Sequence, residues 1–94
     1  MNYIVKTKIG IFFAEEISNE DSSITLVNAF LFSICNRNII DISQNGSSHL
    51  DNNIRSCIAP RIRLLDHIIE AIIPCSNRAS ESLKGLMEST ELIL

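Results

Sequence analysis

Pro74 constrains this chain more than any other residue, because it separates two stretches whose apolar residues have helical spacing. Proline has no backbone N–H and clashes with the preceding helical turn, so a helix does not run through it undisturbed. The sequence therefore predicts one helix that ends at Pro74 and a second that begins at Ser76, whose hydroxyl can cap it. A connection as short as residues 74–76 makes the two helices antiparallel neighbours, which is an αα-hairpin.

Apolar stripes define the two helices of this hairpin. Asp51 or Asn52 can cap the start of the helical region, and Pro60 requires a kink or a fresh start near Ala59. The stripe of the first helix consists of Ile62, Leu65, Ile69 and Ile72, widened by Ile58, Ile68 and Ile73. The buried stripe of the second helix consists of Ala79, Leu83, Leu86, Met87, Thr90 and Ile93.

The N-terminal part has strand patterns instead. Residues 3–9 alternate between apolar and polar, which is typical of a half-buried strand. Gly10 permits a bulge or sharp bend, and residues 11–17 continue with β-formers up to an acidic turn at residues 18–21. A second strand, or a continuation of the first, is therefore expected.

Residues 23–36 combine two conflicting signals. Their β-branched residues favour a strand, while the spacing of Ile24, Val27, Phe30, Leu31 and Ile34 is close to the helical period. We interpret the segment as a helix. A short strand at residues 39–43 and a loop at residues 44–48 follow it.

These expectations give an α+β fold, with short antiparallel strands and one helix in the N-terminal half and an antiparallel αα-hairpin at the C-terminus. A chain of 94 residues has room for one core, so residues 1–94 are expected to form a single domain. Its strand-rich half is 1–43 and its helical half 49–94. The wide apolar stripe of residues 58–73 is too large for so short a chain to cover, which predicts a homo-oligomer.

Composition excludes several classes of protein. A net charge of −3 disfavours binding to long nucleic acids, which need basic surfaces. The cysteines Cys35, Cys57 and Cys75 have no metal-binding spacing, so we expect no metal, no cofactor and reduced thiols in a cytoplasmic protein. No apolar stretch is long enough to span a membrane, and the N-terminus does not have the pattern of a signal peptide.

Catalytic patterns are scarce, so the sequence does not predict an enzyme. His67 lies beside Asp66, and His49 has no such neighbour, but neither belongs to a known catalytic motif. The junction at residues 74–78 is a stronger candidate, because the N–H groups of a helix start attract anions and Arg78 adds a bidentate donor. A plain helix cap at Ser76 is the alternative interpretation.

The same junction resembles a known family. The stretch Ile68-Ile69-Glu70-Ala71-Ile72-Ile73-Pro74-Cys75-Ser76-Asn77-Arg78, with residues 87–93 after it, is similar to the helical hairpin of phage-encoded sponge proteins of the anti-CBASS and Thoeris anti-defence families. The resemblance covers residues 45–94, and Asn77 interrupts the Ser/Arg pair of that hairpin. It implies a non-catalytic sponge in the host cytoplasm that sequesters a cyclic oligonucleotide or cyclic ADP-ribose signal, with Arg78 as a phosphate contact.

Two functions are thus expected from the sequence. In the first, a nucleotide signal is bound by Ser76, Asn77 and Arg78, with Arg55, Arg61 and Arg63 supplied by a neighbouring subunit. In the second, the chain is a small oligomeric interaction module or regulator that grips a partner protein with its apolar hairpin.

The cysteine pattern leads to a first prediction. Titration of the denatured protein should detect three free thiols, because the spacing and odd number of the cysteines argue against a disulfide framework. Detection of one thiol would mean that two cysteines are paired, and would contradict a reducing compartment.

Overall fold

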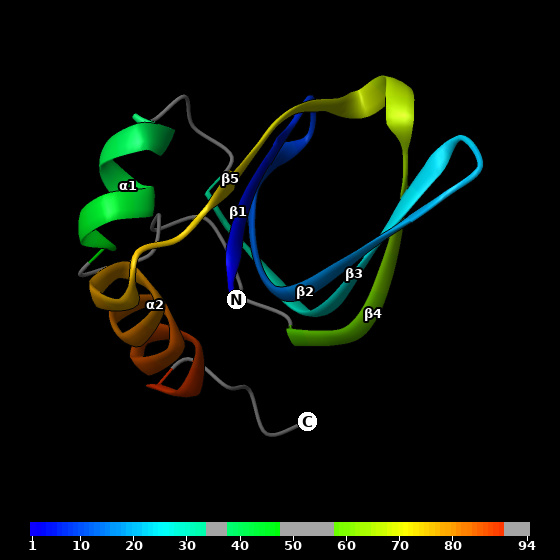
Figure 1. The fold of residues 1–94 in the computed structure, drawn as a ribbon. Coiled ribbons are helices and arrows are strands. Elements are labelled where there is room, and N and C mark those ends of the chain that lie inside the picture. The colour runs from blue at the N-terminus through cyan, green and yellow to red at the C-terminus, as the bar shows by residue number, and fades with distance from the viewer. Residues whose placement is uncertain (34–37, 48–57, 90–94) are drawn as a thin grey trace.

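The computed structural model describes residues 1–33, 38–47 and 58–89, without the side chains of residues 32, 58 and 89. Five antiparallel strands form one sheet in the order β4-β3-β2-β1-β5 (Figure 1). The elements in chain order are β1 (Tyr3–Thr7), β2 (Gly10–Glu20), β3 (Ser23–Ser33), α1 (Ile39–Asn45), β4 (Ile58–Leu65), the 3₁₀ turn η1 (Asp66–Ile68), β5 (Ile69–Pro74) and α2 (Asn77–Ser89).

The predicted α+β fold with a C-terminal αα-hairpin is wrong. Its first helix is replaced by β4 and β5, so the last helix follows a strand, and the described chain is mostly β. The helical spacing arises from two strands on either side of η1. Within β4, Ile62 and Leu64 pack into the core, while Leu65, assigned to the stripe, is 52% exposed. The predicted caps Asp51 and Asn52 lie outside the described residues.

The predicted helix at residues 23–36 is also wrong, because residues 23–33 form β3. Asn28 has a left-handed backbone, with φ of 48°. This conformation resets the two-residue alternation of the strand, so that Leu26 and Ala29, three positions apart, both pack into the same core cluster. A strand with such a reset has helix-like spacing in the sequence. Residues 34–36 lie outside the described part.

The predicted strand at residues 39–43 is replaced by α1. The Oδ1 atom of Asn38 accepts a hydrogen bond from the backbone N–H of Asp41 at 3.1 Å, which caps the helix start. Gly46 ends the helix at a φ of 79°, and its N–H donates to the Ile42 carbonyl at 2.8 Å. Local capping therefore outweighs the β propensity of the isoleucines.

Strands on either side of Gly10 and the last helix are confirmed, but the acidic turn expected at residues 18–21 is wrong, because β2 extends to Glu20 and the chain turns at residues 21–22. Gly10 begins β2 at a φ of 152°, and its N–H donates to the hydroxyl of Thr7 at 3.1 Å, which stabilises the β1–β2 turn. Ile9, expected on the buried face of the first strand, lies in this turn and is 59% exposed. In α2, the predicted stripe residues Ala79, Leu83 and Met87 are buried. Thr90 and Ile93 lie outside the described residues.

The sheet is strongly curved, as β2 shows. A straight strand of this length would span roughly 35 Å. Both ends of β2 nevertheless reach the short turn η1, because Lys8 N–H donates to the Ile68 carbonyl at 2.9 Å and Asp66 N–H donates to the Ser22 carbonyl at 3.0 Å. Figure 1 shows β2 and β3 bending sharply near their middle, with η1 above the opening.

The bend lies where Glu15, Asn28 and Pro60 face one another on β2, β3 and β4. The pairs on either side of this line are Ala14 with Ala29 and Val27 with Arg61. Asn28 Nδ2 donates to Glu15 Oε2 at 3.1 Å, and the left-handed backbone of Asn28 departs from strand geometry. The line therefore interrupts the ladder and permits the sheet to fold over.

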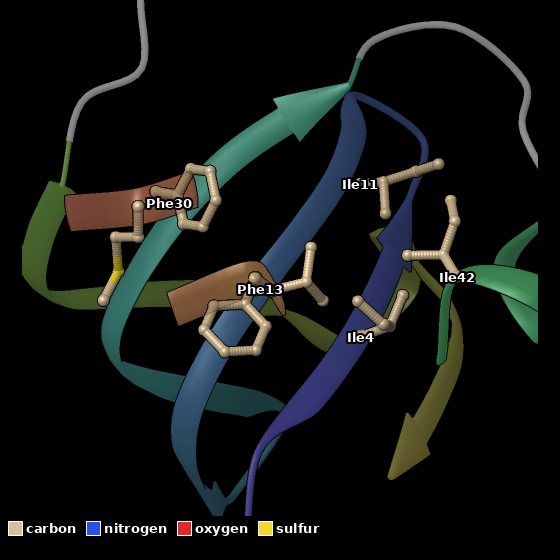
Figure 2. Packing of buried hydrophobic residues seen from close by; sticks show 7 residues of the cluster. Ile4, Ile11, Phe13, Phe30 and Ile42 are labelled. Atoms are coloured by element: carbon tan, nitrogen blue, oxygen red, sulfur yellow. The ribbon is translucent and has the colours of Figure 1, made fainter. Parts of the chain in front are cut away.

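Two apolar clusters cover the two faces of the sheet. The inner cluster fills the curved sheet and contains Val5, Phe12, Ala14, Ile24, Leu26, Ala29 and Leu64. The outer cluster joins the sheet to α1 and α2 and contains Ile4, Ile11, Phe13, Phe30, Ile42, Leu83 and Met87 (Figure 2). The rings of Phe13 and Phe30 meet edge to face at 5.9 Å. Burial on both faces explains why residues 11–14 are all apolar.

The bend at Asn28 leads to a second prediction. Asn28→Gly should change the free energy of unfolding little, because glycine adopts a positive φ without steric cost. Asn28→Val should lower it by about 1–2 kcal/mol relative to the glycine variant, because its Cβ clashes in the left-handed conformation. Urea unfolding measures both values. Equal stability of the two variants would contradict the strained bend.

Candidate interaction surface

The predicted anion-binding residues lie in two separate places. Ser76, Asn77 and Arg78 are at the start of α2, while Arg61 and Arg63 are on β4. Figure 1 shows these two elements on opposite sides of the molecule. Arg55 lies outside the described residues. One chain therefore does not bring the described arginines together around the helix start.

Ser76 is committed to contacts within the protein. Its hydroxyl accepts from Ala79 N–H at 3.1 Å and donates to the Gln44 carbonyl at 2.6 Å. Its own N–H donates to the Ser43 carbonyl at 2.8 Å. Ser76 thus caps α2 and ties its start to α1, which is the alternative interpretation given above. Asn77 and Arg78 are exposed in the first turn of α2.

The candidate acid–base pair lies in η1. Asp66 and His67 are both exposed, and the backbone of Asp66 is bound to Ser22. Nothing encloses either side chain in the described structure. His49 lies outside the described residues, and among those described no three acidic, histidine or cysteine side chains form a group that could hold a metal ion.

Cys75 connects β5 to α2 and is a half-buried free thiol. Burial raises its pKa from 9.0 to about 11, because the thiolate is poorly solvated there. Only the thiolate is an effective nucleophile, so this position does not suit nucleophilic chemistry at neutral pH. Cys35 and Cys57 lie outside the described residues.

The two edge strands of the sheet differ from the central strands in the burial of their aliphatic residues. Among the described strands, β4 pairs only with β3, and β5 pairs only with β1. Both edge strands are rich in aliphatic residues that the fold leaves incompletely buried. On β5, Ile69, Ile72 and Ile73 are half-buried, and on β4, Ile62 is half-buried and Leu65 is exposed. The central strands bury their large side chains far more completely.

Arg61, Arg63 and Leu65 form an outward-facing row on β4, which we call the β4 row. They alternate with Ile62 and Leu64, which pack into the inner cluster. The Nε atom of Arg63 donates to the Ser23 hydroxyl at 3.0 Å, which holds this side chain against the neighbouring strand. Sequence reasoning named both arginines but missed the row. The sequence pattern that could have revealed the row is the strict alternation of polar and apolar residues at positions 61–64, which is typical of a strand.

Comparisons with protein-family models, curated proteins and solved structures found no match. In the described part of the chain, no helix has the length and apolar character required to cross a membrane.

The burial of Cys75 leads to a third prediction. In a Cys35→Ser/Cys57→Ser variant, the rate of alkylation by iodoacetamide should rise with pH to a midpoint near 11, because burial disfavours the thiolate. The same variant in urea should have its midpoint near the ordinary value of 9.0. Identical pH profiles in the two conditions would contradict the burial of this thiol.

Proposed function

We propose that this chain is a non-catalytic protein-interaction module that binds an extended segment of a partner along β4. The observation that carries the proposal is the outer edge of β4, which no described strand covers. Leu65, the last residue of β4, is 52% exposed, so the edge also has apolar surface that a partner can cover. An uncovered edge presents backbone N–H and C=O groups that template a further strand. Addition of a partner strand is a common mode of peptide recognition.

The β4 row determines which segment fits. Main-chain hydrogen bonds give affinity in strand addition, and alternate side chains give specificity. Arg61 and Arg63 favour acidic side chains in the partner, and Leu65 and the half-buried Ile62 favour apolar ones. Pro60 lacks an N–H, so pairing is expected along residues 61–65. The preferred partner is an extended segment that combines apolar residues with acidic ones.

This function replaces the apolar hairpin of the sequence-based hypothesis by a strand edge. The nucleotide-sponge hypothesis depended on a helical hairpin, whose first helix is occupied by β4 and β5. The hydroxyl of Ser76, which that hypothesis assigned to ligand binding, already has two protein partners. Asn77 and Arg78, which it also named, are exposed in the first turn of α2.

Selection of extended peptides from a random displayed library tests the module. Recovered peptides should combine acidic and apolar residues, and their binding should slow amide hydrogen exchange in residues 61–65. The double variant Arg61→Glu/Arg63→Glu should weaken their binding by roughly tenfold, because two exposed attractions become repulsions.

Arg78→Glu is the matched control, because it reverses an exposed arginine of α2, a helix that lies on the opposite side of the molecule from β4 in Figure 1, and should leave peptide affinity unchanged. Peptides that slow exchange only in α2, or that bind the double variant as tightly as the native protein, would contradict binding at β4.

A further inference from the structure

We infer that the strand that occupies the edge of β4 is β5 of a second copy of this chain, so that copies join edge to edge. This inference rests on the proposed function and names its partner. The two strands are the opposite edges of one sheet, in the order β4-β3-β2-β1-β5. Pairing of β4 with the β5 of a neighbour covers one edge of each copy and leaves the other for the next copy. Such head-to-tail contacts form a ring when the rotation between copies closes.

The apolar side chains of the two edges support this pairing. None of the residues of β5 is fully buried, although Ile69, Ile72 and Ile73 belong to the most apolar class. Leu65 on β4 is exposed as well. Open strand edges promote association, and charges, prolines and bulges restrict it; here these are Pro60, Arg61 and Arg63 on β4, and Glu70 and Pro74 on β5. Between these residues each edge still has apolar side chains that the other can cover.

Prolines limit the two edges to stretches of the same length. Pro60 lies near the start of β4 and Pro74 ends β5, so neither can donate to a further strand. Between these prolines and η1, residues 61–65 and residues 69–73 retain every backbone N–H. Two stretches of equal length can pair along their whole extent.

Charge favours pairing of unlike edges over pairing of like edges. The exposed arginines Arg61 and Arg63 belong to β4, and the exposed Glu70 belongs to β5. In a contact between two β4 strands, arginines would face arginines, whereas a contact between β4 and β5 places them near a carboxylate. Like charges across an interface are costly, so this distribution selects the head-to-tail arrangement.

Glu70 is placed for such a contact by a break in the β1–β5 ladder. Lys6 pairs with Ala71 and Thr7 with Ile69, so Glu70 is the extra residue of a bulge. Its carboxylate lies 3.9 Å from Lys6 Nζ, and the side chains are 45% and 32% exposed. An exposed pair at this distance is weak, so it competes little with an arginine from a neighbouring copy.

Reversal of the charges on the two edges, at Arg61 and Arg63 of β4 and at Glu70 of β5, tests the inference in the full chain. Light scattering should show that the native protein is an oligomer in the micromolar range. Arg61→Glu/Arg63→Glu and Glu70→Arg should each raise the concentration for half-assembly by roughly tenfold, because each creates like charges at every contact. An equimolar mixture of the two variants should assemble again, since each contact then joins opposite charges.

Two controls carry the same charge changes on α2, where both residues are exposed: Arg78→Glu and Glu81→Arg. Both should assemble like the native protein. Circular dichroism and thermal unfolding establish that each variant is folded. A mixture of folded variants that stays monomeric, or variants that assemble as well as the native protein, would overturn the pairing of β4 with β5.

Amide hydrogen exchange of the native protein provides a test that needs no substitution. Exchange in residues 61–65 and 69–73 should slow as the protein concentration rises, because the paired edges are then hydrogen-bonded. Equal rates at low and high concentration would overturn self-pairing. If peptides still protect residues 61–65 in that case, the interaction module stands and only its partner is wrong.

Discussion

The fold depends on the two hydrogen bonds that attach η1 to the turns at either end of β2. Lys8 binds the Ile68 carbonyl, and Asp66 binds the Ser22 carbonyl, so a long strand has both of its ends at one short turn. That geometry is possible only if the sheet bends at Asn28. The bend encloses the inner cluster, which a flat five-stranded sheet would leave exposed to solvent. The attachment of η1 to both ends of β2 therefore accounts together for the curvature of the sheet, the enclosed inner cluster and the position of β5.

The same closure leaves the two edges of the sheet without a described neighbour. The turn η1 carries the chain from one edge to the other, so β4 and β5 are consecutive in sequence but are separated by three strands in the sheet. Each strand packs its inner face into the core. Its outer edge pairs with no described strand, and aliphatic residues that are incompletely buried lie along it. The described strands thus enclose an apolar interior and leave two sheet edges that no described strand pairs, and the proposed interactions use these edges.

The two helices have a structural role that accounts for the residues first considered as a ligand site. Leu83 and Met87 of α2 and Ile42 of α1 cover the outer face of the sheet (Figure 2). Ser76 joins the start of α2 to the end of α1 by a hydrogen bond to Gln44 and another to Ser43. A helix start that is tied in this way contributes to packing, and this is the role that the structure shows for Ser76.

The sequence alone determined the features whose causes lie within a few residues. It predicted strand structure on either side of Gly10, a bend near that residue, the cap at Ser76 and the burial of Ala79, Leu83 and Met87, because alternation, glycine conformation and capping act locally. Only the tertiary structure determined that residues 23–33 and 58–74 form the strands β3, β4 and β5 and the turn η1 instead of helices. There, the positive φ of Asn28 and the turn η1 each reset a two-residue alternation, and the resulting spacing imitates a helix. Arg61 and Arg63 were identified by charge, but their place on a sheet edge depends on which strands pair, and pairing between distant segments leaves no local pattern in the sequence.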